Sequence, residues 1–500
     1  MRVTNQMVNH SALKNMQRSQ SRVSITTTRM TTGKKIQKAS DDPVVAMRAL
    51  KLRSTCTQLA QYKDKNIKDA NSWMDVTETS LVNVIKRLTD VYDYCVKGAN
   101  DTFDSTSKNS IVDALNSLKN MIYAEGSATY AGRYIFSGFR TGTDLAFSTP
   151  ESVKGVSYDI TEHLDSTNFE TKNIVSNEMD FNKLNSYIAD MDTYNPPRDG
   201  QVTIMKLAYD GLKEDDFSIS FDGKTLAELG FNLVTKDSTQ AASYYDVGAD
   251  EVVYIPDTGE LVFGEDALAA LQATKDIQVN YSKDNFKVGE LRPDHYFDCT
   301  KHEPQADGTI KDIKFTQPEE GQELRYEVNF NQFITVNTQG RDAITHDMGH
   351  AIDKISHALQ DWINIEDTIT KMKALRNDKE YESDPAKLAA LNQLIEDADV
   401  ELALKRDYAT KLFEQGETTF TNFTNKLSAL QSDVGTRMNK LDMIATRVKE
   451  QYNNFDELKS SNEDVETEEA IIDFNEANLV YNASLAATSN ILQTTLLDYL

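Results

Sequence analysis

The sequence predicts an α+β protein in which both chain ends form a long antiparallel helical coiled-coil bundle, with a β-rich domain inserted in the middle. Helix-breaking residues mark the division. Seven of the nine prolines lie between Pro150 and Pro318, and 17 of the 21 glycines lie between Gly126 and Gly349. Long helices can therefore run only in the two arms outside this stretch. Apolar heptads in the arms and short alternating runs between them support the same division.

The N-terminal arm is expected to contain a long helix and a shorter one that folds back on it. The long helix is predicted by apolar side chains that recur every seven residues, at Met74, Leu81, Leu88 and Cys95. Apolar residues between Ile111 and Ile122 share one helical face, and Gly126 would end this second helix.

A helix boundary is also expected near the start of the chain. Gly33 lets a first helix end, and Ser40 or Asp41 can cap the next helix, with Pro43 in its first turn.

The C-terminal arm repeats the helical pattern more strongly. Asp384 is placed to cap a long helix that has Pro385 in its first turn. One heptad column of this helix contains Leu427, Val434, Leu441, Val448 and Phe455. The last segment has an apolar stripe on an acidic helix, made by Ile472, Leu479, Ala486 and Leu500 with a neighbouring column of Ile471, Leu485, Leu492 and Tyr499.

The middle of the chain is expected to hold mostly antiparallel strands with short helices. Strand patterns occur at residues 217–225, 252–263, 277–281 and 326–330, and the first two contain hairpin turns. The return helix is expected to start near Asp342. The chain should therefore divide into a helix and turn over 1–42, a helical rod over 43–146, the β-rich insert over 147–335, a second rod over 336–460 and a terminal helix over 461–500.

Charge is distributed unevenly along the chain. The net charge is −26, which argues against general nucleic-acid binding. Residues 1–38 nevertheless hold eight basic side chains and no acid, whereas the final 41 residues hold eight acids and no base. The two ends are therefore electrostatic complements, and each carries an apolar stripe that an isolated helix cannot bury.

Membrane insertion is not expected, because no apolar run approaches the ~18 residues that a spanning helix needs. The first residues also lack the pattern of a cleavable secretory signal.

No constellation of residues predicts an enzyme or a cofactor. The strongest candidate is His346-Asp-Met-Gly-His350, since two histidines four residues apart on a helix can share a zinc ion. The alternative is the capped start of a helix in which both histidines are solvated and Met348 packs inward. The three scattered cysteines do not predict a disulfide framework or a cysteine zinc site.

Three segments resemble a known family. Residues 30–43, Met-Thr-Thr-Gly-Lys-Lys-Ile-Gln-Lys-Ala-Ser-Asp-Asp-Pro, look like the signature shared by bacterial flagellins and hook-associated proteins. Residues 132–138, Gly-Arg-Tyr-Ile-Phe-Ser-Gly, are similar to an aromatic strand of hook–filament junction proteins, and residues 496–500 resemble the family's C-terminus. Over about residues 1–147 and 420–500 the chain resembles the flagellar hook-associated protein 3 family.

The resemblance implies a structural, non-catalytic adaptor of the extracellular flagellum, exported through the type III channel without a cleaved signal peptide. The ends would be disordered in the monomer and would pack on assembly as an inner coiled-coil tube. Expected partners are further copies of the chain joined head-to-tail, a hook-side hook-associated protein, flagellin and an export chaperone, with no nucleic acid and no metal.

Together the resemblance and the heptads predict a set of assembly residues. The subunit interface is expected to include Met7, Val23, Met30, Thr32, Gly33, Lys34, Ser40, Asp41, Asp42, Pro43, Met74, Leu81, Leu88, Leu441, Val448, Ile472, Leu479, Leu485, Ala486, Leu492, Leu496, Leu497 and Leu500. The family-motif residues are Gly132, Tyr134, Phe136 and Gly138. The alternatives are a minor flagellin of the filament, or a surface adhesin or metal-dependent hydrolase that acts through the insert or through His346 and His350.

Overall fold

The computed structural model describes residues 5–99, 105–238, 245–305, 309–317, 321–378, 381 and 383–492. The chain forms two compact units. The terminal unit comprises Met1–Asn71, Arg325–Ile334 and Asn439–Leu500, and the central unit comprises Ser72–Leu324 and Thr335–Met438. Each unit thus combines segments from both arms, and each is described separately below.

Long helices dominate both arms, as the heptads predict. Their bounds are Asn5–Thr32 (α1), Pro43–Gln61 (α2), Ile67–Ala99 (α3), Ser105–Glu125 (α4), His346–Leu375 (α10), Pro385–Glu463 (α12) and Thr467–Leu492 (α13). A π-helical turn, Tyr62–Asn66, joins α2 to α3. None of the described helices is both long and apolar enough to cross a membrane.

In the central unit, helices from the two arms pack in antiparallel register. The predicted seam on α3 is confirmed, because Met74, Leu81, Leu88 and Cys95 have no exposed surface. The backbones approach closely: a Cβ at Gly98 would lie 2.5 Å from the Phe413 ring, and one at Gly416 would lie 2.8 Å from Cys95 Sγ. Residue numbers thus increase along α3 where they decrease along the facing part of α12, so the two helices are antiparallel.

Several expected helix boundaries are confirmed. Residues of α4 from Ile111 to Ile122 bury one face, and Gly126 follows its last residue. Asp384 caps α12 by accepting the backbone N–H groups of Ala386 at 3.0 Å and Lys387 at 3.2 Å. The return helix is interrupted: a short helix, Gly340–Ala343 (α9), precedes α10.

Two sheets form the β-rich part of the central unit. The five-stranded sheet has the order β4-β5-β10-β9-β8, and the six-stranded sheet has the order β13-β12-β3-β11-β6-β7. All strand pairs in them are antiparallel except β8 with β9. The strands are Ser157–Leu164 (β3), Phe169–Ser176 (β4), Arg198–Lys206 (β5), Ser218–Phe221 (β6), Lys224–Thr225 (β7), Asn232–Thr235 (β8), Glu251–Ile255 (β9), Glu260–Phe263 (β10), Ile277–Lys283 (β11), Asp298–Pro304 (β12) and Ile310–Phe315 (β13).

The two sheets share one hydrophobic core. Tyr158 and Tyr281 from the six-stranded sheet pack in the same cluster as Met205, Tyr254 and Leu261 from the five-stranded sheet. The hairpins predicted within residues 217–225 and 252–263 are confirmed as β6–β7 and β9–β10. The strand pattern predicted at residues 277–281 lies within β11. Short helices flank the sheets, at Pro150–Val153 (α5), Leu184–Ala189 (α6), Leu226–Leu229 (α7) and Glu265–Leu271 (α8).

In the terminal unit, a small hairpin packs on the π-helical turn. Its strands are Arg325–Asn329 (β14) and Gln332–Thr335 (β15). Tyr62 donates its hydroxyl to Glu327 Oε1 at 2.9 Å, and the Asn66 amide donates to the Glu327 carbonyl at 2.8 Å. The Phe330 ring stands edge-on to Tyr62, with the ring centroids 5.5 Å apart. Residues 325–335 therefore pack on the N-terminal arm, although they were expected to belong to the β-rich insert over 147–335.

Candidate assembly interface

The two chain ends meet at paired turns in the terminal unit. Gly33 ends α1 with φ +68°, a backbone conformation that glycine adopts without strain. Its carbonyl accepts the N–H of Val465 at 2.9 Å, and the Lys35 N–H donates to the Glu463 carbonyl at 2.8 Å. The α1–α2 turn is thus hydrogen-bonded to the α12–α13 turn.

The start of α2 is capped by Asp42, not by Ser40 or Asp41 as the sequence predicted. The Asp42 carboxylate accepts the N–H groups of Val44 at 3.0 Å and Val45 at 3.1 Å. Because Pro43 is the first helical residue, only the residue directly before it can occupy the capping position. Asp41 instead closes the preceding turn by accepting the N–H of Lys38 at 2.9 Å, and Ser40 is exposed.

An ionic clasp joins the arms beside these turns. Arg53 on α2 donates to the Glu463 carboxylate with Nε at 2.7 Å and Nη2 at 2.6 Å, a two-point geometry that is stronger than a single contact. Lys34 pairs with Asp464 and lies 3.6 Å from Glu463. The Glu463 side chain is only 3% exposed, whereas that of Arg53 is 56% exposed.

The clasp changes the protonation behaviour of its acids. The hydrogen bond from Arg53 lowers the pKa of Glu463, with further lowering by the Arg53 and Lys34 charges against the opposing effect of burial. The hydrogen bond from Lys34 likewise lowers the pKa of Asp464. Both carboxylates therefore stay ionised near neutral pH, and the clasp weakens only under acidic conditions.

We expect the Arg53→Ala substitution to weaken the pairing of the arms by about 1–2 kcal/mol, because it leaves a nearly buried carboxylate with only Lys34 beside it. Hydrogen–deuterium exchange should show faster exchange at the start of α2 and in the turn after α12. The matched control is Arg22→Ala. Arg22 and Glu476 lie 3.6 Å apart and are both more than half exposed, so exchange should hardly change. Equal effects of the two substitutions would contradict the role of the clasp.

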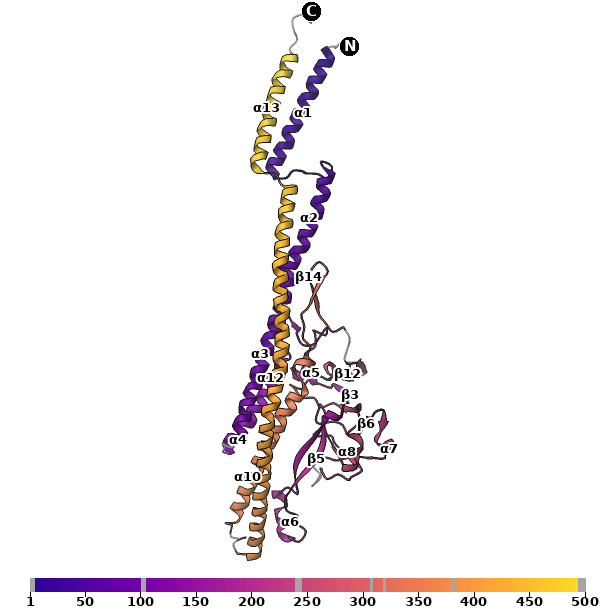
Figure 1. The fold of residues 1–500 in the computed structure, drawn as a ribbon, viewed down its shortest axis with the longest axis vertical. Helices are drawn as coiled ribbons and strands as arrows, with labels where there is room; N and C mark the ends of the chain where they lie inside the picture. Colours follow the sequence, from indigo (N-terminus) through magenta and orange to yellow (C-terminus); the bar gives the residue numbers. More distant parts are fainter. Residues whose placement is uncertain are drawn as a thin grey trace, which may run out of the picture. The chain divides into compact units, whose positions relative to one another are not determined.

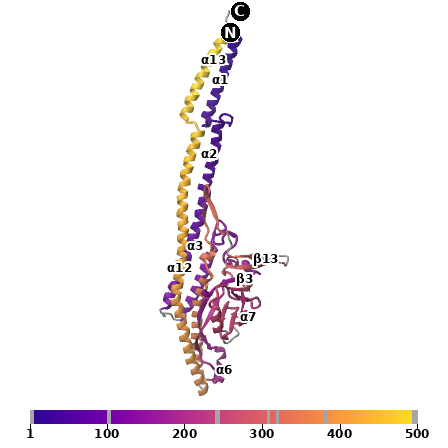
Figure 2. The ribbon, with the colours of Figure 1, turned by 45° about the vertical axis from the view of Figure 1, so that its right-hand side comes forward.

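Helices α1 and α13 pack side by side within one chain (Figures 1 and 2). The buried side chains of these two helices are small, namely Thr26, Ala470, Ala477 and Thr488, and the hydroxyls of Ser19 and Ser484 lie 3.2 Å apart. The resemblance implies that both ends are disordered before assembly, and disorder in the free chain stays a prediction.

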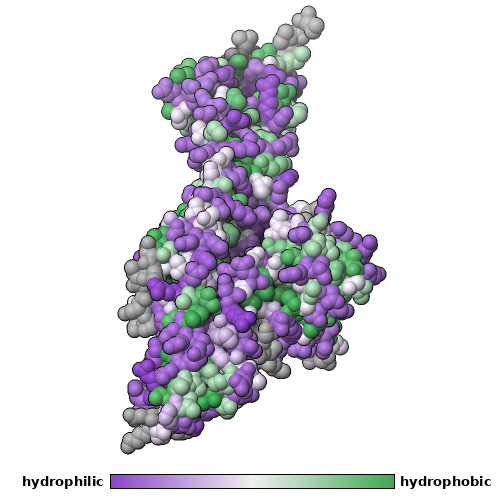
Figure 3. All heavy atoms as spheres, turned by 60° about the horizontal axis from the view of Figure 1, so that its bottom comes forward, coloured by the Kyte–Doolittle hydropathy of each residue, from purple (hydrophilic) through white to green (hydrophobic). Residues whose placement is uncertain are grey.

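Most large apolar side chains of these two helices remain exposed after the pairing. They are Met7, Val8, Leu13, Ile25 and Met30 on α1, and Ile471, Ile472, Leu479, Val480, Leu485 and Ile491 on α13. Leu479 is 73% exposed. We call this set the apolar arm surface. Figure 3 shows one face of the molecule, on which hydrophobic residues (green) are interspersed with hydrophilic ones (purple).

The remaining residues of the predicted interface fall into four groups. Val23, Gly33, Lys34 and Asp42 are half-buried in the terminal unit, and Thr32, Pro43 and Ala486 are exposed. Met74, Leu81 and Leu88 in the central unit, and Leu441 and Val448 in the terminal unit, are buried within this chain. Leu492 ends α13, and Leu496, Leu497 and Leu500 lie outside the described residues.

The family-motif segment contains a strand, Arg133–Tyr134 (β2), which is shorter than the predicted aromatic strand and pairs in a tight hairpin with Thr129–Tyr130 (β1). Gly132 turns the hairpin with φ +76°, and Gly138 has φ +62°. Phe136 is 1% exposed, and its carbonyl accepts the Gly340 N–H at 2.8 Å. The hairpin is short because the chain turns inward after Tyr134 to bury Phe136.

The two histidines of the zinc alternative are packed rather than solvated, so that expectation is wrong. The His346 ring lies 4.9 Å from Tyr209 and 4.8 Å from Tyr296, and burial lowers its pKa to about 3. His350 Nε2 donates to the Ala208 carbonyl at 3.2 Å. No group of three or more potential ligands that could hold a metal ion occurs among the described residues.

Sequence reasoning missed Arg53 and assigned Glu463 to the wrong helix. The terminal helix was expected to span residues 461–500, but α12 continues through Glu463 and α13 begins at Thr467. The opposite charges of the two ends were the only signal, and they do not identify which acid meets which base.

Family models match both ends of the chain. The model of the bacterial flagellin N-terminal helical region matches residues 3–141, and the model of the C-terminal helical region matches residues 418–500. The two ends of this chain are thus similar to the helical regions of bacterial flagellins. The N-terminal match includes α1 to α4 and the motif hairpin, and the C-terminal match includes the end of α12 and all of α13.

Two sequence relatives are both named flagellar hook-associated protein 3. The protein from Salmonella typhimurium is 25% identical over 167 residues, which are 33% of this chain and 52% of that protein. The protein from Escherichia coli is 26% identical over 144 residues, which are 29% of this chain and 45% of that protein. The chain thus spans about half the length of the relatives that it matches.

Solved structures of flagellar proteins show low similarity. A putative flagellar hook-associated protein from Vibrio parahaemolyticus has a TM-score of 0.36 and 11% identity, covering 85% of this chain and all of that one. A flagellar junction protein from Legionella pneumophila has a TM-score of 0.27 and 9% identity, covering 79% of this chain and 99% of that one.

Proposed function

We propose that the protein is a structural component of the bacterial flagellum, an adaptor at the hook–filament junction that polymerises head-to-tail through its terminal helices. The proposal rests on the apolar arm surface, which stays exposed after α1 and α13 have paired. The flagellin-type ends and the names of the two sequence relatives support the place of action. The protein would have no catalytic activity.

The physical argument for polymerisation is the amount of apolar surface left on both helices. Burial of a leucine or isoleucine side chain that is otherwise exposed stabilises an assembly by roughly 1.5–3 kcal/mol. Several such side chains on α1 and α13 are left uncovered by the described part of the chain, and a neighbouring molecule in an assembly would cover them. A head-to-tail contact whose rotation does not close into a ring generates a helical tube.

The charges of the arms would orient the contact. Opposite charges increase the rate of association and suppress the wrong orientation more than they add affinity. Further partners in this proposal are a hook-side hook-associated protein, flagellin and an export chaperone that would bind the apolar C-terminal helix. The assembled protein would be extracellular.

Removal of residues 466–500 tests the proposal. Because both tryptophans of the chain, Trp73 and Trp362, belong to the central unit, their fluorescence should stay native-like in the truncated protein. Assembly on isolated hooks, followed by electron microscopy with gold-labelled antibody, should be lost. Labelled collars made by the truncated protein would contradict the proposal, and labelling along the whole shaft by the full chain would indicate a filament flagellin instead.

A point variant sharpens this test. Leu479→Asp places a charge on the apolar arm surface without changing the buried Ala477, and it should reduce assembly at least about tenfold, since one such side chain contributes about 1.4 kcal/mol or more. The control is Glu468→Gln, an exposed acid in the first turn of the same helix. Unchanged assembly of Leu479→Asp would contradict the role of this surface.

A further inference from the structure

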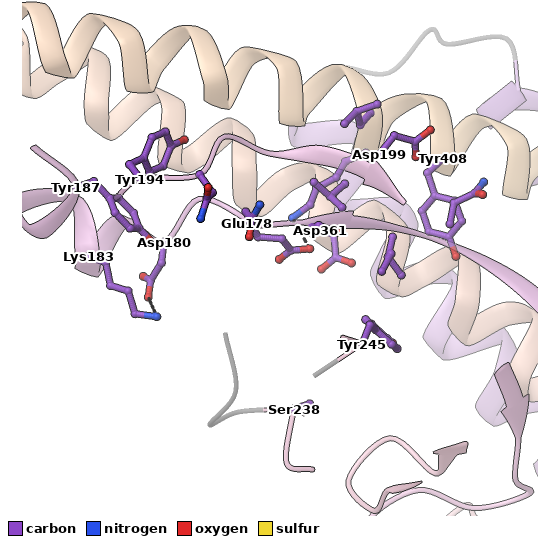
Figure 4. Close-up of a pocket in the computed structure, with 18 of the residues that line it drawn as sticks. Glu178, Asp180, Lys183, Tyr187, Tyr194, Asp199, Ser238, Tyr245, Asp361 and Tyr408 are labelled. Atoms are coloured by element: carbon purple, nitrogen blue, oxygen red, sulfur yellow. Dashed lines mark ion pairs between the residues drawn. The ribbon is translucent and has the colours of Figure 1, made fainter. Parts of the chain in front are cut away.

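The central unit is hollowed beside its five-stranded sheet and over its six-stranded sheet. The first hollow, of about 610 Å³, is drawn in Figure 4, where Glu178 lies 3.3 Å from Lys405 and Lys183 lies 3.7 Å from Asp180. The second, of about 660 Å³, lies on the face of the six-stranded sheet that points away from the shared core. We call this face the outer sheet face, and polar side chains cover it.

Four side chains from four neighbouring strands form a hydrogen-bonded row across the outer sheet face. Ser282 on β11 donates its hydroxyl to Asp159 Oδ1 on β3 at 2.7 Å. Asp159 Oδ2 lies 2.9 Å from His302 Nε2 on β12, and His302 Nδ1 lies 2.7 Å from Asp312 Oδ1 on β13. His302 and Asp312 are directly opposite each other in the strand register. The row therefore links β11, β3, β12 and β13 in their order in the sheet.

The two contacts of the His302 ring require a particular protonation state. Ionised carboxylates only accept hydrogen bonds, so both ring nitrogens must donate, and only the charged imidazolium carries two N–H groups. Burial lowers the pKa of His302, but the hydrogen bonds to Asp159 and Asp312 and the charges of these two residues outweigh it and raise the pKa above 6.5. A neutral ring could donate to one carboxylate only, and its other nitrogen would face an acceptor oxygen.

Other charged groups act on the row from further away. Burial raises the pKa of Asp159, but the hydrogen bonds and charges of its neighbours, among them Lys213, lower it overall. Lys213 also lies 3.1 Å from Asp284. Among the described residues, the His302 ring forms hydrogen bonds only with Asp159 and Asp312. The remaining charged residues that line the hollow are His163, Asp216, Asp298 and Lys314.

Strand β13 lies at the end of the row and has few other attachments. It is an edge strand that pairs only with β12 among the described strands. None of its six side chains is buried, and Ile310 at its start is 67% exposed. Phe315 at its other end packs against the shared core. The first half of β13 therefore depends on the backbone ladder to β12 and on the contact between Asp312 and His302.

We propose that His302 is a pH-sensitive clip, which ties the start of β13 to β3 while the ring is protonated and releases it when the ring is neutral. Below pH 6.5 the ring is protonated in both the folded and the unfolded chain, and the clip contributes fully. The contribution is lost as the pH rises through the raised pKa of the folded chain. Because the Asp159 and Asp312 side chains are more than half exposed, the loss is small and promotes local opening of the edge strand.

Hydrogen–deuterium exchange of the full chain at pH 6 and pH 9, corrected for the intrinsic exchange rate, tests the proposal. The protection of the β13 amides should be about threefold lower at pH 9 in the native protein, the size of one exposed ion pair, and nearly equal at the two pH values in His302→Gln. Burial raises the pKa of Glu162 on β3 to about 7, but Glu162 is the same in both proteins, so its titration cancels in the comparison. Equal pH dependence in the two proteins would overturn the proposal.

A second measurement follows the ring itself. Nuclear magnetic resonance of the full chain with isotope-labelled histidine gives the titration midpoint of His302, whose signal is assigned by its loss in His302→Gln. Asp312→Asn should lower this midpoint, because it removes one of the two charged acceptors. The matched control, Asp276→Asn, removes the carboxylate that lies 3.3 Å from His163 and should leave the His302 midpoint unchanged. Equal shifts in the two variants, or no shift in Asp312→Asn, would show that His302 is not held between two carboxylates.

Discussion

Replacement of Glu162 by glutamine should stabilise the central unit more at alkaline pH than at acidic pH. The free energy of unfolding of the variant minus that of the native protein should rise by about 3 kcal/mol between the two conditions. Glu162 on β3 is 2% exposed. Its Oε1 accepts the Ala208 N–H at 2.9 Å and the hydroxyl of Tyr281. Burial raises the pKa of this carboxyl from 4.5 to about 7, against the lowering effect of both hydrogen bonds.

The sign follows from the two protonation states. Below pH 4.5 the carboxyl is protonated in both the folded and the unfolded chain, and its contribution is fully present. Between pH 4.5 and about 7 the unfolded chain releases the proton first, so stability falls with rising pH and then levels off. Glutamine can accept the same two hydrogen bonds without this titration.

Urea unfolding followed by tryptophan fluorescence measures this effect, because Trp73 and Trp362 both report on the central unit. The informative quantity is how much the difference in free energy of unfolding between Glu162→Gln and the native protein changes from pH 4 to pH 8. An amide N–H₂ left without a partner would lower the variant's stability equally at every pH, so it does not affect this change. Glu214→Gln removes a carboxylate from an exposed position of the same unit and serves as the control. A pH-independent difference for Glu162→Gln would contradict the prediction.

Leu81→Ala should lower the free energy of unfolding of the central unit by about 2–5 kcal/mol, because it leaves a cavity in a closely packed seam. Leu81 has no exposed surface, and it shares its α3 face with Met74 and Leu88. The same urea titration by tryptophan fluorescence measures the loss.

The neighbouring residue supplies the control for this prediction. Val82 is 43% exposed on the same helix, so Val82→Ala should change stability by no more than about 0.5 kcal/mol. A small effect of Leu81→Ala would show that the seam is not closed within one chain and that its burial depends on other subunits.

The helical arms and the hairpins could be predicted from the sequence because their signals are local. The seven-residue spacing from Met74 to Cys95 reports a helical face whatever packs on it, and the cap at Asp384 involves only residues close in the chain. The β9–β10 hairpin follows in the same way from two apolar runs joined by a turn.

The solvated histidines were the clearest wrong expectation. The polar character of His346 favoured exposure, yet its ring is enclosed by Tyr209 and Tyr296, which are distant in sequence. The capping residue of α2 was wrong by one or two positions for a smaller reason: three consecutive polar residues before Pro43 can each cap a helix, and only the backbone geometry selects Asp42.

The sequence by itself determined the periodic elements of this protein: where helices can run, which faces are apolar, and that its two ends carry opposite charge. These properties depend on neighbours within a few residues. Only the tertiary structure decided that Arg53 meets Glu463, that Met74, Leu81 and Leu88 are covered inside the chain while Leu479 is not, and that His302 lies between two carboxylates. The physical reason is that burial and ion pairing depend on which distant segments come together, and the same apolar or charged pattern is compatible with many such pairings.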